Sequence, residues 1–93
     1  MTHESSTTEI DIWCRVIAPD TGDLPNEVAR EWLRLRISDT DAERVEELSR
    51  RASSGQLTAS QERELDMYLT IGQALDFLHA KARLSLRNRP ADK

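Results

Sequence analysis

Residues 55–87, GQLTASQERELDMYLTIGQALDFLHAKARLSLR, predict one long capped helix that decides the fold of this chain. Thr58 and Gln61 have the spacing of a capping box, in which a hydroxyl and an amide bond the free N–H groups of a helix start. Gly55 suits the left-handed residue that ends a preceding helix. About 28 residues without proline follow, so the helix can extend over roughly 42 Å. In a 93-residue protein, a helix of that length needs a partner to cover it.

The apolar residues of this helix form one broad stripe that covers about half of its circumference. The stripe comprises Leu65, Tyr68, Ile71, Gly72, Leu75, Leu78, Ala82 and Leu86. Many of its members alternate by three and four residues, as in a heptad seam, although His79 interrupts the seam. Phe77 and Leu84 lie off the stripe and, being seven residues apart, share another face. They are the first candidates for an exposed contact.

Three shorter helices are expected before the long one. Residues 9–17 follow a capping-box pattern at Thr8, with a strand left open as the alternative because Ile10 and Ile12 alternate. Pro25 suits the first position of a helix over 25–36.

Ser38 suits the N-cap of a helix over 39–53. Between the first two helices, Gly22 is expected to permit a positive φ in a turn. The predicted fold class is therefore all-α: a small bundle of a short N-terminal helix, two medium helices and one long C-terminal helix. Residues 8–88 form the predicted domain, residues 1–7 a disordered tail and residues 89–93 a frayed basic tail.

Helix lengths indicate where a second chain docks. The helix over 39–53 is roughly 22 Å long and covers only the first half of the long helix. The helix over 25–36 is expected to cover the same half. From Ala74 onward, only the 9–17 segment remains as a cover. We therefore expect the second half of the long helix to bind another chain; the alternative is that its end frays.

The chain shows no constellation that supports catalysis. Its one cysteine, Cys14, stands among apolar residues and is expected to be half-buried, and no His or Cys pair has metal-ligand spacing. Asp76 and His79 are placed to hydrogen-bond, without a nucleophile beside them. We expect no enzyme activity and no cofactor. No apolar run approaches a membrane span, and the N-terminus lacks a signal-peptide pattern, so a cytoplasmic location is expected.

The net charge of −4 is unevenly distributed along the chain. Residues 81–93 carry a net charge of +4, and the other 80 residues carry −8. A basic tail suggests phosphate contacts, but Glu62, Glu64 and Asp66 at the start of the long helix would repel phosphate. Direct nucleic-acid binding is therefore the weaker reading. The predicted partner-binding residues are Phe77, Lys81, Arg83, Leu84 and Arg87. The alternative for Phe77 and Leu84 is packing beneath the N-terminal helix with Trp13.

Several segments resemble a family of small helical bacterial proteins. They are Leu24–Arg30, Ile37–Asp41, the run from Gly55 to Tyr68 with Gln61 before Glu62-Arg63-Glu64, and Lys81–Leu86. Members typically show G-x-L-T-x-x-E-x-x-E-L-x-x-Y and end in KARLSL, and the resemblance covers roughly residues 9–87. Such proteins are often encoded beside an HNH-type endonuclease or another toxin-like protein. The resemblance implies an antitoxin-like or accessory role with that protein as partner, and it transfers no functional residues.

Three functions follow as hypotheses. The leading one is a small antitoxin-like protein that binds and restrains a co-encoded toxin or nuclease through its C-terminal helix. The second is a homodimeric structural or adaptor protein that associates through the long helix. The third is an autoregulatory DNA binder.

Overall fold

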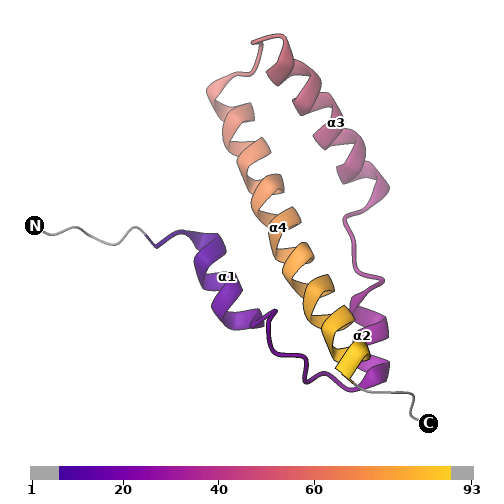
Figure 1. Ribbon diagram of the computed structural model, residues 1–93. Helices are drawn as coiled ribbons and strands as arrows, with labels where there is room; N and C mark the ends of the chain where they lie inside the picture. Colours follow the sequence, from indigo (N-terminus) through magenta and orange to yellow (C-terminus); the bar gives the residue numbers. More distant parts are fainter. Residues whose placement is uncertain (1–6, 89–93) are drawn as a thin grey trace, which may run out of the picture. The chain divides into compact units, whose positions relative to one another are not determined.

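The computed structural model describes residues 7–88, and over that range it contains helices and no strand (Figure 1). The helices are α1 (Glu9–Ile17), α2 (Asn26–Trp32), α3 (Asp39–Ser53) and α4 (Ala59–Asn88). This confirms the all-α class and the long C-terminal helix. The tails predicted over 1–7 and 89–93 fall outside the described residues, except for Thr7.

Side-chain caps start three of the helices where the sequence predicts them. At α1 the Thr8 hydroxyl accepts a bond from the Asp11 amide, and the Asp11 carboxylate accepts one from the Thr8 amide. Ser38 accepts from the Asp41 amide in the same way before α3. These contacts satisfy N–H groups that have no partner within a helix. The strand alternative over residues 9–17 is wrong.

At α4 the capping box is reciprocal. The Thr58 hydroxyl accepts from the Gln61 amide at 3.1 Å, and the Gln61 side-chain oxygen accepts from the Thr58 amide at 3.0 Å. Gly55, with a φ of 70°, ends the turn after α3 and confirms the expected left-handed residue.

α2 is shorter than the expected helix over 25–36. It begins at Asn26, with Pro25 as its N-cap, and ends at Trp32. Beyond that point the Arg34 amide bonds to the Glu31 carbonyl and the Leu35 amide to the Trp32 carbonyl. These i to i+3 bonds form tighter 3₁₀-type turns, which rarely continue for long.

In the turn after α1, Ala18 and not Gly22 adopts a positive φ. Ala18 adopts the left-handed conformation, with a φ of 55°, and its amide bonds to the Cys14 carbonyl. Gly22 is needed for space: a Cβ at this position would lie 2.8 Å from Cγ of Leu84. The expectation of a positive φ at Gly22 is therefore wrong, because close approach of the turn to α4 sets the requirement.

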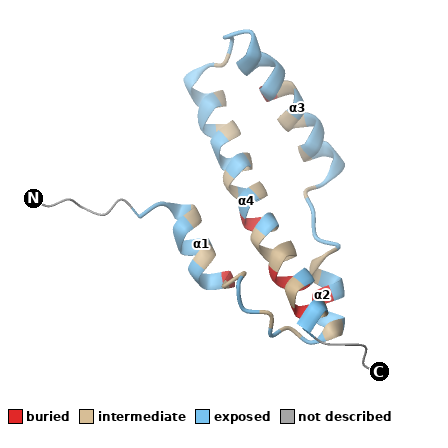
Figure 2. Cartoon of the chain, in the orientation of Figure 1, coloured by how far each residue is buried: buried red, intermediate tan, exposed pale blue. Residues whose placement is uncertain are grey.

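The chain divides into two units. The first contains the described residues up to Leu35 together with those from Gln73 onward. Its buried residues include Ile17 of α1, Ala29 of α2 and the α4 residues Ala74, Ala82 and Ser85. Within α4, buried residues occur only in this C-terminal half (Figure 2). α2 was expected to cover the first half of the long helix; that expectation is wrong, since α2 shares a unit with the second half.

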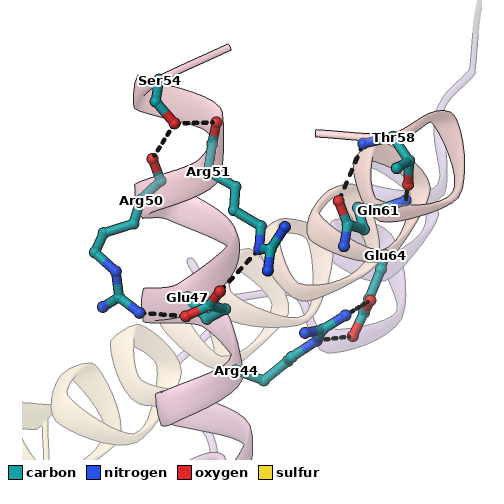
Figure 3. A network of polar contacts seen from close by, with 8 residues as sticks. All are labelled: Arg44, Glu47, Arg50, Arg51, Ser54, Thr58, Gln61 and Glu64. Atoms are coloured by element: carbon teal, nitrogen blue, oxygen red, sulfur yellow. Dashed lines mark hydrogen bonds and ion pairs between the residues drawn. The ribbon is translucent and has the colours of Figure 1, made fainter. Parts of the chain in front are cut away.

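The second unit, Arg36–Gly72, pairs α3 with the first half of α4. Leu48 of α3 is fully buried. The Tyr68 hydroxyl donates to Asp41 at 2.7 Å. Arg44 binds Glu64 through two hydrogen bonds of 2.7 Å (Figure 3). Polar contacts between the helices thus supplement a core with few large side chains.

Candidate protein-binding surfaces

α1 carries apolar side chains on two faces. Ile10, Cys14 and Ile17 form the inner face, of which Ile17 is buried and the other two are half-buried. Cys14 therefore confirms the half-buried position expected for it. Ile12, Trp13 and Val16 form the other apolar face, which we call the outer face of α1; they are 50%, 40% and 70% exposed. A helix of nine residues buries only one of its faces in this chain.

A polar contact holds the aromatic side chain of the outer face. The indole Nε1–H of Trp13 donates a hydrogen bond of 3.2 Å to the Glu9 carboxylate, one helical turn earlier. Glu9 is therefore a neighbour of Trp13 and Val16 on the same side of the helix. An exposed Trp whose polar atom is already bonded presents its ring as a ready apolar contact.

Lys81 ties the end of α1 to α4. Its ammonium group donates to the Ile17 carbonyl at 2.9 Å, lies 3.4 Å from the Ala18 carbonyl and pairs with Asp23 at 3.2 Å. Four residues on, the Ser85 hydroxyl accepts from the Leu24 amide and donates to the Lys81 carbonyl. These contacts fasten the turn after α1 over its whole length.

The five predicted partner-binding residues differ in their surroundings. The expectation that Lys81 is a surface cation is wrong: Lys81 is 8% exposed, and its ammonium is committed to internal acceptors. Leu84 is half-buried and lies close to Gly22, and Phe77 is also half-buried. Arg83 and Arg87 remain exposed. The structure does not bring the five residues together as one surface.

Large exposed apolar side chains also occur in the first half of α4. Met67, Leu69 and Ile71 are 60%, 57% and 48% exposed. This reverses the expected distribution, in which the half from Ala74 onward had the surplus of apolar surface. Sequence reasoning missed it because helix periodicity gives the faces of α4 but does not reveal which neighbours cover them.

α3 carries a polar network along its C-terminal half (Figure 3). Glu47 binds Arg51 at 2.8 Å and also pairs with Arg50. The bond from Arg51 is the main cause that lowers the pKa of Glu47. A hollow of about 340 Å³ lies over this network and reaches Ser54 and Gln56. Both arginines pair with the same carboxylate, so each guanidinium that lines the hollow is already engaged by Glu47.

The polar contacts between α3 and α4 in the second unit also shift pKa values. The bond from Arg44 lowers the pKa of the Glu64 carboxyl, although burial opposes the shift. The bond to Asp41 raises the pKa of Tyr68. Both shifts favour the forms that make these contacts, which are the ionised Glu64 carboxylate and the protonated Tyr68 hydroxyl. The two contacts therefore help to hold α3 against α4.

Among residues 7–88, no group of three His, Cys, Asp or Glu side chains could hold a metal ion. The ring Nε2 of His79 lies 2.8 Å from the Leu35 carbonyl oxygen, and Asp76 has no hydrogen bond to it. The expected Asp76–His79 contact is therefore wrong. In the same range no helix is long and apolar enough to cross a membrane.

Together, these features define a small helical protein with exposed apolar side chains on α1 and on the first half of α4. Family models, curated proteins and solved structures give no match to this chain.

Proposed function

We propose that this chain is an antitoxin-like protein that binds and restrains a toxin or nuclease encoded beside it. The outer face of α1, formed by Ile12, Trp13 and Val16, is the observation that supports the proposal. The resemblance to proteins encoded beside HNH-type endonucleases suggests the identity of the partner.

The spacing of the outer face fits recognition of a helix by a groove. Ile12 and Val16 are one turn apart, and Trp13 lies beside them, so the three side chains project from one side of a short helix. An amphipathic helix that places such anchors in an apolar groove is a common mode of peptide recognition. We therefore expect the partner to offer an apolar groove, and the bound α1 to obstruct the partner's active surface.

The contact assigned here differs from the one expected from the sequence. Lys81 cannot contact a partner while its ammonium serves Ile17, Ala18 and Asp23. Its role becomes a positioning one, because it fixes the end of the helix that carries the anchors. Burial of Lys81 also removes one of the cations on which direct nucleic-acid binding would depend.

Co-expression with the product of the neighbouring gene tests the proposal. We expect the wild-type chain to co-purify with that product and to relieve its toxicity. Ile12→Asp should abolish both effects, because it places a carboxylate in the groove contact. Met67→Asp is the matched control, since it makes the same chemical change at an exposed apolar position of α4.

Two results would defeat the proposal: absence of a complex with the wild-type chain, or equal loss of binding in Ile12→Asp and Met67→Asp. Circular dichroism of both variants shows whether each keeps its helices.

A further inference from the structure

A hollow of about 540 Å³ lies along the first half of α4. Its lining residues are Ser60, Arg63, Glu64, Asp66 and Met67. Four of them stand at positions i, i+3, i+4 and i+7, the spacing of the side chains that form a hole on one helix for a knob of another. All five belong to the second unit, so this surface lies within one compact part of the chain.

The same side of the helix carries exposed apolar side chains. Met67 is 60% exposed, and Ile71, one helical turn further on, is 48% exposed. Leu69 is also exposed, but its position two residues after Met67 places it on roughly the opposite side of the helix. Met67 and Ile71 therefore project beside the hollow, and Leu69 does not.

One wall of the hollow is fixed by a contact from α3. Arg44 donates two hydrogen bonds of 2.7 Å to the Glu64 carboxylate (Figure 3). The charge of Glu64 is thereby paired before a second chain arrives. A thioether such as that of Met67 can enter the hollow without facing an uncompensated carboxylate.

Arg63 and Asp66 carry opposite charges on one flank of Met67. At 100° per residue they lie roughly 40° and 100° round the helix from it, in the same direction. Both are exposed. Neither has an ion pair within residues 7–88, where other side chains form the pairs. The flank thus offers one cation and one anion to an incoming helix.

The hollow and Met67 complement each other when a second copy is turned end for end. The centre of the hollow lies between Arg63 and Glu64. When Met67 of each copy is level with that point in the other copy, Asp66 comes within about 2 Å, along the axis, of the level of Arg63. Equal flanks face each other across an antiparallel two-fold pair, so both Arg63–Asp66 ion pairs form in this one register.

The rest of the surface fits the same register. Ile71 of one copy comes level with Ala59 and Ser60 of the other, where small side chains leave room for it. A parallel pair fits less well, because it sets the flank of Asp66 against the opposite flank of the second copy. Arg63 is the one cation between residues 59 and 71, so Asp66 would then face none.

We propose that this surface binds a second copy of the chain, with the first halves of the two α4 helices antiparallel and related by a two-fold axis. A two-fold interface requires a surface that complements itself, as Met67 with the hollow and Arg63 with Asp66 do. The apolar side chains supply the driving force, and the two ion pairs fix the direction and register. The contact extends over roughly 18 Å of helix, so the dimer belongs to the small, transient class.

Sedimentation equilibrium of the full chain, at protein concentrations up to about 1 mM, tests the proposal. The wild type should dimerise. Met67→Asp places a carboxylate in the hollow of the second copy and should weaken dimerisation by roughly tenfold or more. Leu69→Asp is the matched control, since it makes the same change on the other side of the same helix; it should keep the wild-type dissociation constant. Circular dichroism shows whether each variant keeps its helices.

A charge exchange tests the antiparallel register. Arg63→Asp sets aspartates opposite Asp66 of the second copy, and Asp66→Arg sets arginines opposite Arg63, so each variant alone should self-associate more weakly. A mixture of the two pairs every charge again and should dimerise as the wild type does. An effect confined to the helix of each chain would not be repaired by mixing.

Three results would overturn the proposal: a wild type that stays monomeric at about 1 mM, equal weakening by Met67→Asp and Leu69→Asp, or a mixture that does not recover dimerisation. The test is separate from that of the antitoxin-like function. Ile12→Asp should dimerise normally and fail to bind the toxin, whereas Met67→Asp should stay monomeric and still bind it.

Discussion

The ammonium group of Lys81 donates a hydrogen bond of 2.9 Å to the carbonyl oxygen of Ile17, 64 residues earlier in the chain. Ile17 is the last residue of α1. The carbonyls at the end of a helix have no amide partner within it, and the helix dipole favours a cation there. Lys81 therefore caps a free carbonyl at the end of α1, as Thr8 caps a free amide at its beginning. It also fixes the base from which the outer face of α1 projects.

Replacing Lys81 by Met should destabilise the protein by about 1–3 kcal/mol, the usual cost when buried acceptors lose their donor. Methionine keeps most of the aliphatic stem, so the loss reports on the ammonium. Urea denaturation at pH 7 measures the change. Arg30→Met, at an exposed residue of α2, is the control and should stay within about 0.5 kcal/mol of the wild type. Equal effects in both variants would contradict the assigned role of Lys81.

The helix starts could be predicted because capping is local. Thr8, Ser38 and Thr58 each bond to an amide three residues away, so the sequence shows both partners within one window. The early end of α2 was missed because the 3₁₀-type turns after Trp32 have no comparable signal.

The environment of Lys81 could not be predicted in that way. Its acceptors lie more than 60 residues away, and within its own helix Lys81 stands among arginines as part of a basic run. Periodicity assigns such a cation to solvent, whereas the fold brings carbonyl oxygens to it. The same limit applies to Leu84, which periodicity places off the apolar stripe of α4 but which lies against Gly22 of the distant turn after α1.

The two glycines Gly22 and Gly72 should respond to alanine with opposite signs. At Gly22 a Cβ meets Leu84 at less than 3 Å, so Gly22→Ala should cost about 1–3 kcal/mol through overpacking. At Gly72, inside α4, a Cβ meets nothing within 4 Å. There alanine should stabilise the protein by roughly 0.5–1 kcal/mol, because glycine weakens a helix interior. Thermal unfolding of the two variants side by side measures both effects, and equal signs would refute this account.

The Arg44–Glu64 pair should make stability depend on acid. The bond from Arg44 lowers the pKa of Glu64 in the folded state below its ordinary value of 4.5. A carboxyl with a lowered folded pKa contributes stability above its unfolded pKa and loses it as the pH falls through the folded pKa. Glu64→Gln should therefore be less stable than the wild type at pH 7, and this difference should shrink below about pH 4.5.

Urea midpoints measured from pH 7 down to pH 3 give the comparison. Glu46→Gln is the matched control, since Glu46 is exposed on α3 and has no ion pair in the described part of the chain. A pH-independent difference for Glu64→Gln would show that packing of its side chain, and not its charge, stabilises the helix pair.

Leu48 should be the most sensitive apolar position of the second unit. Within residues 7–88 it is the one large apolar side chain that is fully buried, whereas Met67 on α4 is 60% exposed. Truncating a buried leucine removes its transfer free energy and leaves a cavity, so Leu48→Ala should cost about 2–5 kcal/mol. Met67→Ala truncates a side chain of similar size that is largely exposed to solvent. The stability of this variant should stay within about 0.5 kcal/mol of the wild type. Small domains are stable by only about 5–15 kcal/mol, so the first loss should move the urea midpoint far below that of the wild type. A small effect at Leu48 would mean that the polar contacts of Asp41, Arg44, Glu64 and Tyr68, rather than the apolar core, hold α3 to α4.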